Sequence, residues 1–389
     1  MKVSISVIIP TYNRAHYIGE CLKSVLPLQQ MGAEIIVIDD GSTDNTMGVL
    51  SEFGDQINYS KKNNEGKAAA INEILPLIDT EYTLFLDDDD ILVPETVINF
   101  LEILSNDPDL DVAFGNVIPF LDTPLNPGSS TMRPMPHRNP DSDLFYYLLE
   151  SNFFHLNSVV FRTRLFEKTG PFNSSLIRSQ DYDFLIKLMY LSNWIYVNKT
   201  VFYIREHHGI RGSSLIFTEW NNVSKLWSKY DKIIGEMIYS KYSISAFSHS
   251  SSKDSPNAVI KRAALFQRSH VMFTKNLQRN AIDDFRLALE SYSGDISPLL
   301  NCEKQSILGI FESPTLKNYL TSKANRNNLI SLINKHNNVA VKKLILKRMY
   351  WNLRKIPKIR RLNIYSSQLI FFISLLLSTK SRLQTNIDD

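Results

Sequence analysis

The sequence predicts an α/β fold in which a mixed, mostly parallel sheet is flanked by helices and followed by a helical C-terminal region. Two observations support this prediction. Short runs of β-branched residues first alternate with amphipathic segments at the spacing of βαβ units, which build parallel sheets. After Ser214 the alternation stops, and the chain becomes helical and polar. We therefore predict an α/β domain at residues 1–215, a helical accessory region at 216–335 and a basic amphipathic tail at 336–389.

The elements at the start of the α/β part can be assigned in chain order. Strands are predicted where β-branched or aromatic residues cluster between turn signals: VSISVIIP at 3–10, EIIVI at 34–38, INYSK at 57–61, YTLFL at 82–86 and VAFGNV at 112–117. Helices are predicted where apolar residues recur every three or four positions: one with Ile18, Leu22 and Val25, one with Leu50 and Phe53, one at 65–75 and one at 94–104. This order brings the carboxyl ends of several strands to one edge of the sheet, where such folds bind ligands.

The second half of the α/β part is less regular. Residues 119–142 are rich in Pro, Gly, Asn and Ser and predict a long mobile loop. Beyond that loop, LNSVVFR at 156–162 and WIYVNKTVFYI at 194–204 predict strands, and DYDFLIKLMYL at 181–191 predicts a helix. A pair of helices is predicted at 257–292.

Cysteine content and the first residues limit the class of protein. Cys21 and Cys302 lie far apart and outside any CxxC or Cys/His cluster, so neither a disulfide framework nor a zinc site is predicted. The apolar run SISVIIP is short and lacks a cleavage site, so we expect no signal peptide. A cytoplasmic, reducing environment is the simplest interpretation.

Charge is distributed unevenly along the chain. The formal net charge is +3, from 43 Lys and Arg and 40 Asp and Glu. Residues 313–387 contain 15 Lys and Arg and no acidic residue, so the first 312 residues carry a net charge of −10. An acidic body with a basic tail predicts that the tail contacts something anionic, either phospholipid or nucleic acid.

The tail combines a basic segment with a short apolar run. In a helix, one side would carry Leu344, Ile345, Met349, Leu353 and Ile356. The following run LIFFISLLLS has about half the roughly 20 residues that a membrane-spanning helix needs. We therefore predict peripheral contact with an anionic membrane, at the inner face of the plasma membrane. The alternative is a helix packed on the protein body with Lys and Arg outward. No nucleic-acid partner is expected, because nothing in the α/β part supports one.

Four consecutive aspartates are the strongest chemical signal. Asp87, Asp88, Asp89 and Asp90 directly follow the apolar strand at 82–86. A helix cap in a solvated turn would account for one or two of them. Four adjacent carboxylates repel one another, and a divalent cation that prefers oxygen, Mg²⁺ or Mn²⁺, would offset this repulsion. An EF-hand is excluded because the acidic residues are contiguous.

Two further segments point to a phosphate-containing ligand. Mg²⁺ held by one or two carboxylates usually completes its shell with water and substrate phosphates, so a diphosphate ligand is expected. Asp39 and Asp40 end a second strand and could accept hydrogen bonds from a base or ribose, although this segment taken alone favours an ordinary Asp-Gly turn before a capped helix. Lys67 follows Gly66 at a predicted helix start, where it could contact phosphate.

Taken together, these segments resemble the family 2 glycosyltransferases, inverting enzymes of the GT-A fold, of the kind that builds bacterial surface glycans. The resemblance extends over about residues 3–215 and is carried, in order, by SVIIPTYNR, EIIVIDDGSTDNT, NEGKAAAIN, LFLDDDDILVP, SQDYDFLIKL and REHHGIRGSS. It implies transfer of a sugar from a nucleotide-sugar donor, UDP-sugar by default, to a hydroxyl of a glycan or lipid-linked acceptor in surface polysaccharide biosynthesis.

The resemblance also implies roles for individual residues. It assigns the nucleotide-sugar to Pro10, Tyr12, Asp39, Asp40, Lys67 and Asp87. Within LDDDD the family pattern is Asp, any residue, Asp, Asp, so Asp89 would bind the cation. Asp181 would be the general base. The family has a Glu-Asp pair at this point, and this chain has Gln180-Asp181 instead. Local spacing alone favours Asp181 as a helix cap.

The segment REHHGIRGSS would close over the diphosphate. Arg205 and Arg211 are then candidates for phosphate contacts, and His207 and His208 for the metal. The extra residues in this segment blur the match, and an exposed polar loop is the alternative.

Two other classes of protein remain open. One is a catalytically silent module that binds nucleotide-sugar or metal. The other is a sugar-nucleotide nucleotidyltransferase, which normally has a Gly-rich loop after its first strand, and PTYNRAHY contains no glycine.

Overall fold

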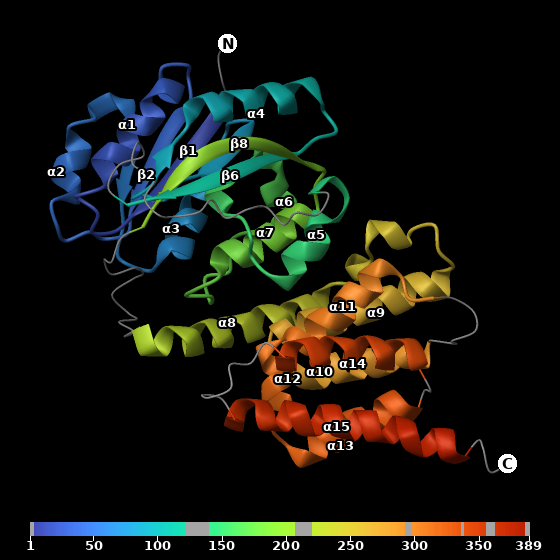
Figure 1. The fold of residues 1–389 in the computed structure, drawn as a ribbon. Coiled ribbons are helices and arrows are strands. Elements are labelled where there is room, and N and C mark those ends of the chain that lie inside the picture. The colour runs from blue at the N-terminus through green and yellow to red at the C-terminus, as the bar shows by residue number, and fades with distance from the viewer. Residues whose placement is uncertain are drawn as a thin grey trace. The chain divides into compact units, whose positions relative to one another are not determined.

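An eight-stranded sheet forms the centre of the first part of the chain (Figure 1). The computed structural model describes residues 4–121, 140–206, 220–291, 298–335, 338–354 and 362–385. These residues form two units, 1–148 with 152–223, and 149–151 with 224–389. Each unit is described by itself.

The sheet is mixed, with the order β3-β2-β1-β4-β7-β6-β8-β5. Its strands are β1 (Ile5–Thr11), β2 (Glu34–Asp39), β3 (Asn58–Lys61), β4 (Tyr82–Phe85), β5 (Ile91–Leu92), β6 (Val112–Phe120), β7 (Val159–Arg162) and β8 (Trp194–Arg205). The first four are parallel, as predicted. β7 runs antiparallel to β4 and β6, and β8 is parallel to β6. Every residue of β1 is buried, which explains its continuous apolar sequence.

Helices cover both faces of the sheet. They are α1 (Ile18–Gln29), α2 (Thr46–Ser51), α3 (Lys67–Ile74), α4 (Pro94–Asn106), α5 (Pro140–Glu150), α6 (Phe166–Thr169) and α7 (Gln180–Tyr190). Figure 1 shows α1 and α4 on one side of the sheet and α3 and α7 on the other. On the α7 side, Phe184 stacks on Phe172 with ring centroids 4.3 Å apart and also contacts Phe85 of β4. These contacts fix α7 against the strand that leads into the four aspartates.

Two features of the first unit differ from the sequence prediction or lie partly outside the described residues. The predicted mobile loop at 119–142 falls mostly on residues 122–139, which lie outside the described residues. Its edges differ from the prediction, because β6 continues to Phe120 and α5 begins at Pro140.

β5 was not predicted. It forms because Ile91 and Leu92, directly after the aspartates, pair antiparallel with Tyr203 and Phe202 of β8.

The second unit consists of helices. They are α8 (Trp220–Lys241), α9 (Asn257–Thr274), α10 (Gln278–Glu290), α11 (Asn301–Glu312), α12 (Pro314–Tyr319), α13 (Lys323–Lys335), α14 (Val339–Arg354) and α15 (Leu362–Thr385). The predicted helix pair is α9 with α10. A buried ion pair crosses the interior of the unit, where Arg262 donates to the Glu303 carboxylate at 2.6 and 2.9 Å.

The basic tail is helical where it is described. α14 buries Val341, Ile345 and Met349 and packs against α11 and α15. The side chain of Leu353 and all of Ile356, predicted for the same apolar side, lie outside the described residues. Among the described helices, none combines the length and apolar character that crossing a membrane requires.

Candidate active site

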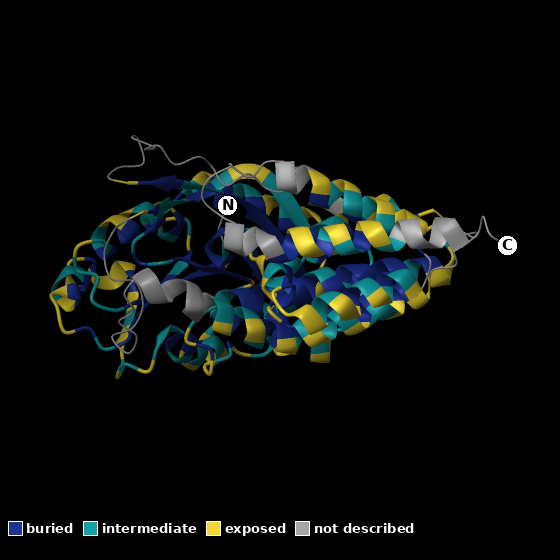
Figure 2. Ribbon diagram, turned by 60° about the horizontal axis from the view of Figure 1, so that its bottom comes forward, coloured by how far each residue is buried: buried dark blue, intermediate teal, exposed yellow. Residues whose placement is uncertain are grey.

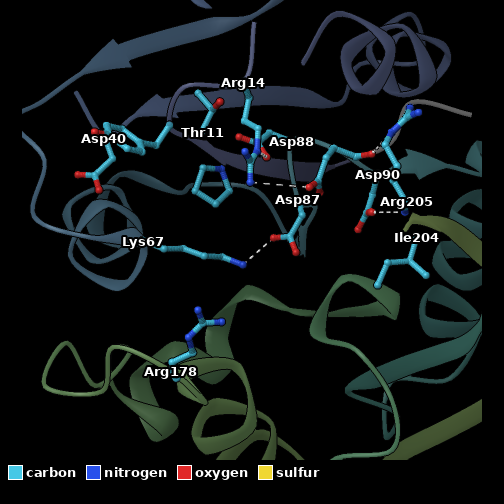
Figure 3. Close-up of a pocket in the computed structure, with 13 residues that line it drawn as sticks. Thr11, Arg14, Asp40, Lys67, Asp87, Asp88, Asp90, Arg178, Ile204 and Arg205 are labelled. Atoms are coloured by element: carbon cyan, nitrogen blue, oxygen red, sulfur yellow. Dashed lines mark hydrogen bonds and ion pairs between the residues drawn. The ribbon is translucent and has the colours of Figure 1, made fainter. Parts of the chain in front are cut away.

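A pocket of about 310 Å³ opens at the carboxyl ends of β1, β2 and β4 (Figure 3). This is the edge of the sheet at which the sequence predicts a ligand. The walls come from the end of β1, from the aspartate loop, from the start of α3 and from the end of β8. Polar and charged side chains dominate the lining, with Pro10 and Ile204 as apolar exceptions.

The four aspartates have four different environments. Leu86, just after β4, donates its N–H to the Ile8 carbonyl at 3.0 Å and ends the ladder. Asp87 then pairs with Lys67 at 2.6 Å, while Asp88 and Asp89 lie 3.5 and 4.0 Å from the guanidinium of Arg14. The protein's own cations therefore offset part of the repulsion that the sequence attributes to a bound metal.

Asp90 points into the interior. Its carboxylate accepts the Arg205 backbone N–H at 3.0 Å and the Asn157 side-chain amide at 3.2 Å. It is 1% exposed, and burial together with the charge of Asp87 raises the pKa of Asp90 well above its ordinary value. Asp90 thus holds the loop against β8 and the segment before β7, although it also belongs to the pocket lining.

The pKa values of the other loop aspartates diverge. Burial, reinforced by neighbouring Asp89, raises the pKa of Asp88 to about 7. Burial acts in the same direction on Asp87, but the charge and hydrogen bond of Lys67 outweigh it and lower the pKa of Asp87. At neutral pH the loop therefore carries fewer negative charges than four adjacent aspartates imply.

Asp39 and Asp40, at the end of β2, have different environments. Asp40 lines the pocket, and its carboxylate accepts the N–H groups of Glu65 and Gly66 at 2.9 and 2.8 Å. These bonds hold Gly66 at a φ of 95° and set the start of α3 at Lys67. Asp39 is fully buried and accepts the Ser42 N–H at 2.7 Å, so it does not line the pocket.

Asp181 lies in the first turn of α7, within reach of Lys67. The Lys67 Nζ is 3.8 Å from the Asp181 carboxylate and 2.6 Å from that of Asp87. The N-cap of α7 is Ser179, in the left-handed conformation at φ 63°, so Asp181 is not the cap residue. Asp183 turns away and pairs with Lys187 at 2.6 Å.

Arg205 ends β8 and supports the loop from behind. Its Nε donates to the Asp89 carbonyl at 3.0 Å, and its guanidinium pairs with Glu20 at 2.5 Å. The same group stacks over the rings of Tyr17 and Phe120. Although it lines the pocket, its described contacts mainly fix the backbone of the aspartate loop.

The pocket collects most of the residues that the sequence singles out. Pro10, Tyr12, Asp40, Lys67, Asp87, Asp89 and Arg205 line it. The candidates His207, His208 and Arg211 lie outside the described residues. Sequence reasoning missed Arg14 and Arg178, which also line the pocket. Figure 3 shows Arg178 pointing toward Lys67 and Asp87. Each missed arginine lies a few residues from a recognised motif position, Arg14 after Tyr12 and Arg178 before Asp181, which is the signal that could have found them.

Metal ligands are sparse in the described part of the chain. It contains no group of three or more His, Cys, Asp or Glu side chains arranged to hold a metal ion. Asp88 and Asp89 both line the pocket and both face Arg14. Mg²⁺ often uses only one or two carboxylates and takes its other oxygens from water and phosphate. The donor set fits that mode of binding, with Asp89 as the candidate ligand.

Comparison with known proteins identifies the class to which this fold and site belong. Residues 6–170 match the family model for glycosyl transferase family 2. Residues 6–170 therefore form a glycosyl transferase family 2 domain, and the glycosyltransferase class that the motifs predict is confirmed.

Individual relatives share this domain at moderate identity. An uncharacterized glycosyltransferase of Rickettsia felis is 28% identical over 280 residues, which cover 70% of this chain and 44% of that protein. The glycosyltransferase GlyG of Streptococcus pneumoniae is 37% identical over 120 residues, 30% of this chain and 40% of that protein. The match thus spans less than half the length of either relative.

A solved structure confirms the fold class. Residues 1–349 of S. aureus TarS, crystallised in complex with UDP-GlcNAc, superpose with a TM-score of 0.50 at 15% identity. The match covers 92% of this chain and 93% of that one. The predicted GT-A fold, with its mostly parallel sheet and helical C-terminal region, is therefore correct.

Proposed function

We propose that this protein transfers a sugar, with inversion, from a nucleotide-sugar to a hydroxyl of a glycan or lipid-linked acceptor in surface polysaccharide biosynthesis. One observation carries the proposal. Lys67 contacts both Asp87, at the end of β4, and Asp181, at the start of α7, so one cation joins the aspartate loop to the candidate base. A donor diphosphate at the loop would then lie near a carboxylate able to accept a proton.

The chemical step needs one base. The acceptor oxygen forms a bond to the anomeric carbon while the bond from that carbon to the diphosphate oxygen breaks. The acceptor's proton passes to the Asp181 carboxylate, and the electron pair of the broken bond leaves with the nucleoside diphosphate. Attack from the face opposite the leaving group inverts the anomeric centre.

The leaving diphosphate develops negative charge, and the pocket is equipped to balance it. Arg14, Lys67 and Arg178 all line the pocket and can donate to phosphate oxygens. Mg²⁺ or Mn²⁺ held at Asp89 would add Lewis-acid stabilisation of the same oxygens. In this proposal Arg14 exchanges its contact with Asp88 and Asp89 for one with the donor.

The nucleotide would occupy the β1 and β2 side of the pocket, along Pro10, Tyr12 and Asp40. UDP is the proposed nucleotide, because the family that the motifs resemble uses it most often. We assign catalysis to residues 1–215, acceptor positioning to the helical region at 216–335 and membrane contact to the tail at 336–389. The site of action is the cytoplasm, at the inner face of the plasma membrane where the acceptor is lipid-linked.

A donor panel tests the proposal. The purified chain is incubated with UDP-, GDP- and dTDP-sugars and with Mg²⁺ or Mn²⁺, and release of nucleoside diphosphate is measured. Release from one donor, dependent on the cation, is expected. Donor binding without release under any condition would instead favour a catalytically silent module. Formation of pyrophosphate from a nucleoside triphosphate and a sugar phosphate would favour a nucleotidyltransferase.

A further inference from the structure

One face of α15 exposes a continuous row of apolar side chains. Leu369, Ile370, Ile373, Leu376 and Leu377 are each between 41% and 57% exposed. Their spacing of one, three or four residues places them on one side of the helix. On the other side Phe371 and Leu375 are buried, and the Phe371 ring lies 6.2 Å from that of Phe311 in α11. The helix is thus apolar both inward and outward.

This row, hereafter the α15 stripe, is concentrated where other exposed apolar residues are scattered. Among the described residues, fourteen large hydrophobic side chains are exposed, and five of them fall within nine residues of α15. Figure 2 shows exposed residues recurring on successive turns of the helix that leads to the C label. Single exposed apolar residues are ordinary, whereas a contiguous row marks an interaction surface.

Positive charge accompanies the stripe. Residues 313–387 contain 15 Lys and Arg and no acidic residue. The neighbouring helix α14 is tied to α15 by Lys342, whose Nζ donates to the Ser378 Oγ at 3.1 Å. Lys343 and Lys347, one helical turn apart on α14, are exposed. The α15 stripe and the exposed lysines of the adjacent helix α14 would therefore be complementary to a partner that is apolar in part and negatively charged in part.

We propose that the α15 stripe lies on an anionic lipid bilayer, with its apolar side chains at the acyl boundary and Lys343 and Lys347 near headgroup phosphates. The stripe is about 12 Å long, against a hydrocarbon core of about 30 Å, so α15 lies in the plane of the membrane. A second copy of the chain is a poorer partner, because pairing through this face would oppose two acid-free basic regions. The proposal concerns a surface of the second unit and stands whether or not sugar transfer is demonstrated.

Vesicle sedimentation with the full chain tests this proposal. The protein should sediment with vesicles of phosphatidylcholine and phosphatidylglycerol at low salt, and much less with phosphatidylcholine alone. The triple variant Ile370→Gln, Ile373→Gln, Leu377→Gln should bind the anionic vesicles about tenfold more weakly or less. The matched control Leu77→Gln, Leu287→Gln replaces exposed apolar residues elsewhere and should bind like the original chain.

A charge variant and a solution measurement complete the test. Lys343→Gln with Lys347→Gln should weaken binding to anionic vesicles about tenfold, and high salt should remove the difference. This variant leaves the stripe intact and covers the case in which the triple variant fails to fold. The proposal is overturned if the original chain does not sediment with anionic vesicles, or if both variants bind them as strongly as the original chain. A dimer in equilibrium sedimentation that the triple variant abolishes, without vesicle binding, would assign the stripe to a second copy instead.

Discussion

The Lys67 Nζ lies 3.8 Å from the Asp181 carboxylate, although the two residues belong to different helices and are 114 positions apart. The same Nζ lies 2.6 Å from Asp87. Partial burial lowers the pKa of Lys67, but the carboxylates of Asp181 and Asp87 outweigh it and raise the pKa above its ordinary value. Lys67 therefore stays protonated, and α3 supplies a fixed cation between the candidate base and the loop.

Replacing Asp181 by Asn should remove turnover and spare donor binding. The amide keeps the shape of the carboxylate but cannot accept the acceptor's proton, and general-base catalysis contributes about 10²- to 10⁴-fold. We expect a loss of that order in the rate of nucleoside diphosphate release. Asp79→Asn, an exposed acid in the same unit, serves as the matched control and should be unaffected. An Asp181→Asn variant with unchanged turnover would exclude this residue as the base.

Replacing Lys67 by Met should lower both the affinity for the donor and the rate of sugar transfer. Hydrogen bonds to charged groups contribute about 1.5 to 3 kcal/mol, which corresponds to about 10- to 150-fold in kcat/KM. The change also leaves Asp87 without its 2.6 Å partner, so donor affinity should fall with kcat. Titration of the donor by calorimetry, alongside steady-state rates, measures both.

Lys23→Met supplies the comparison for Lys67→Met, because Lys23 is an exposed lysine on α1. It should leave both affinity and rate unchanged. If Lys67→Met behaves like Lys23→Met, the contact between Lys67 and the aspartate loop contributes to neither donor binding nor turnover.

The location of the site could be predicted from the sequence because it follows from local patterns. Alternating strands and helices fix a parallel sheet, and parallel strands bring their carboxyl ends to one edge, so Asp40 and Asp87 meet there without any knowledge of packing. Lys67 joins them because its helix begins at the same edge.

The environments of the individual aspartates could not be predicted. Asp90 is buried and accepts hydrogen bonds from Asn157 and Arg205, which are 67 and 115 residues away in the chain. Such contacts depend on how β7 and β8 add to the sheet, and no local pattern encodes their order. The expectation that a divalent cation offsets the repulsion among the four carboxylates therefore did not include the chain's own cations, of which Arg14 is the clearest case.

Gly235→Ala should destabilise the second unit. In the interior of an ordinary helix, Ala is more stable than Gly by about 0.5 to 1 kcal/mol. In α8, however, a Cβ at this position would lie 2.5 Å from the Lys275 Cβ and 2.9 Å from the Leu277 Cδ1. The clash should outweigh the propensity gain and cost about 1 to 3 kcal/mol.

Gly19→Ala is the matched substitution in α1, where the added Cβ would meet only the Val49 Cγ1, at an ordinary 3.4 Å. It should be neutral or stabilising. Thermal unfolding of both variants gives the comparison, and a Gly235→Ala chain as stable as Gly19→Ala would show that α8 and the α9 terminus can separate without cost.

Because Lys275 is buried, the free energy of unfolding of the second unit should increase with pH. Its side chain is 4% exposed, and burial lowers its pKa from 10.5 to about 8, even though Asp231 lies 3.8 Å away. Between these two values the unfolded chain binds a proton that the folded chain does not, so the free energy of unfolding rises as pH rises from about 8 to 10.5. A shift of this size corresponds to about 3 kcal/mol.

Lys275→Met should remove this pH dependence and stabilise the unit at neutral pH, because the cost of burying the charge disappears. Lys253→Met changes an exposed lysine of the same unit and should keep the original pH profile. Urea unfolding at several pH values, followed by hydrogen exchange in α9, separates the two variants. If the unfolding free energy of the Lys275→Met chain rises between pH 8 and 10.5 as steeply as that of the original chain, another group is responsible for the rise.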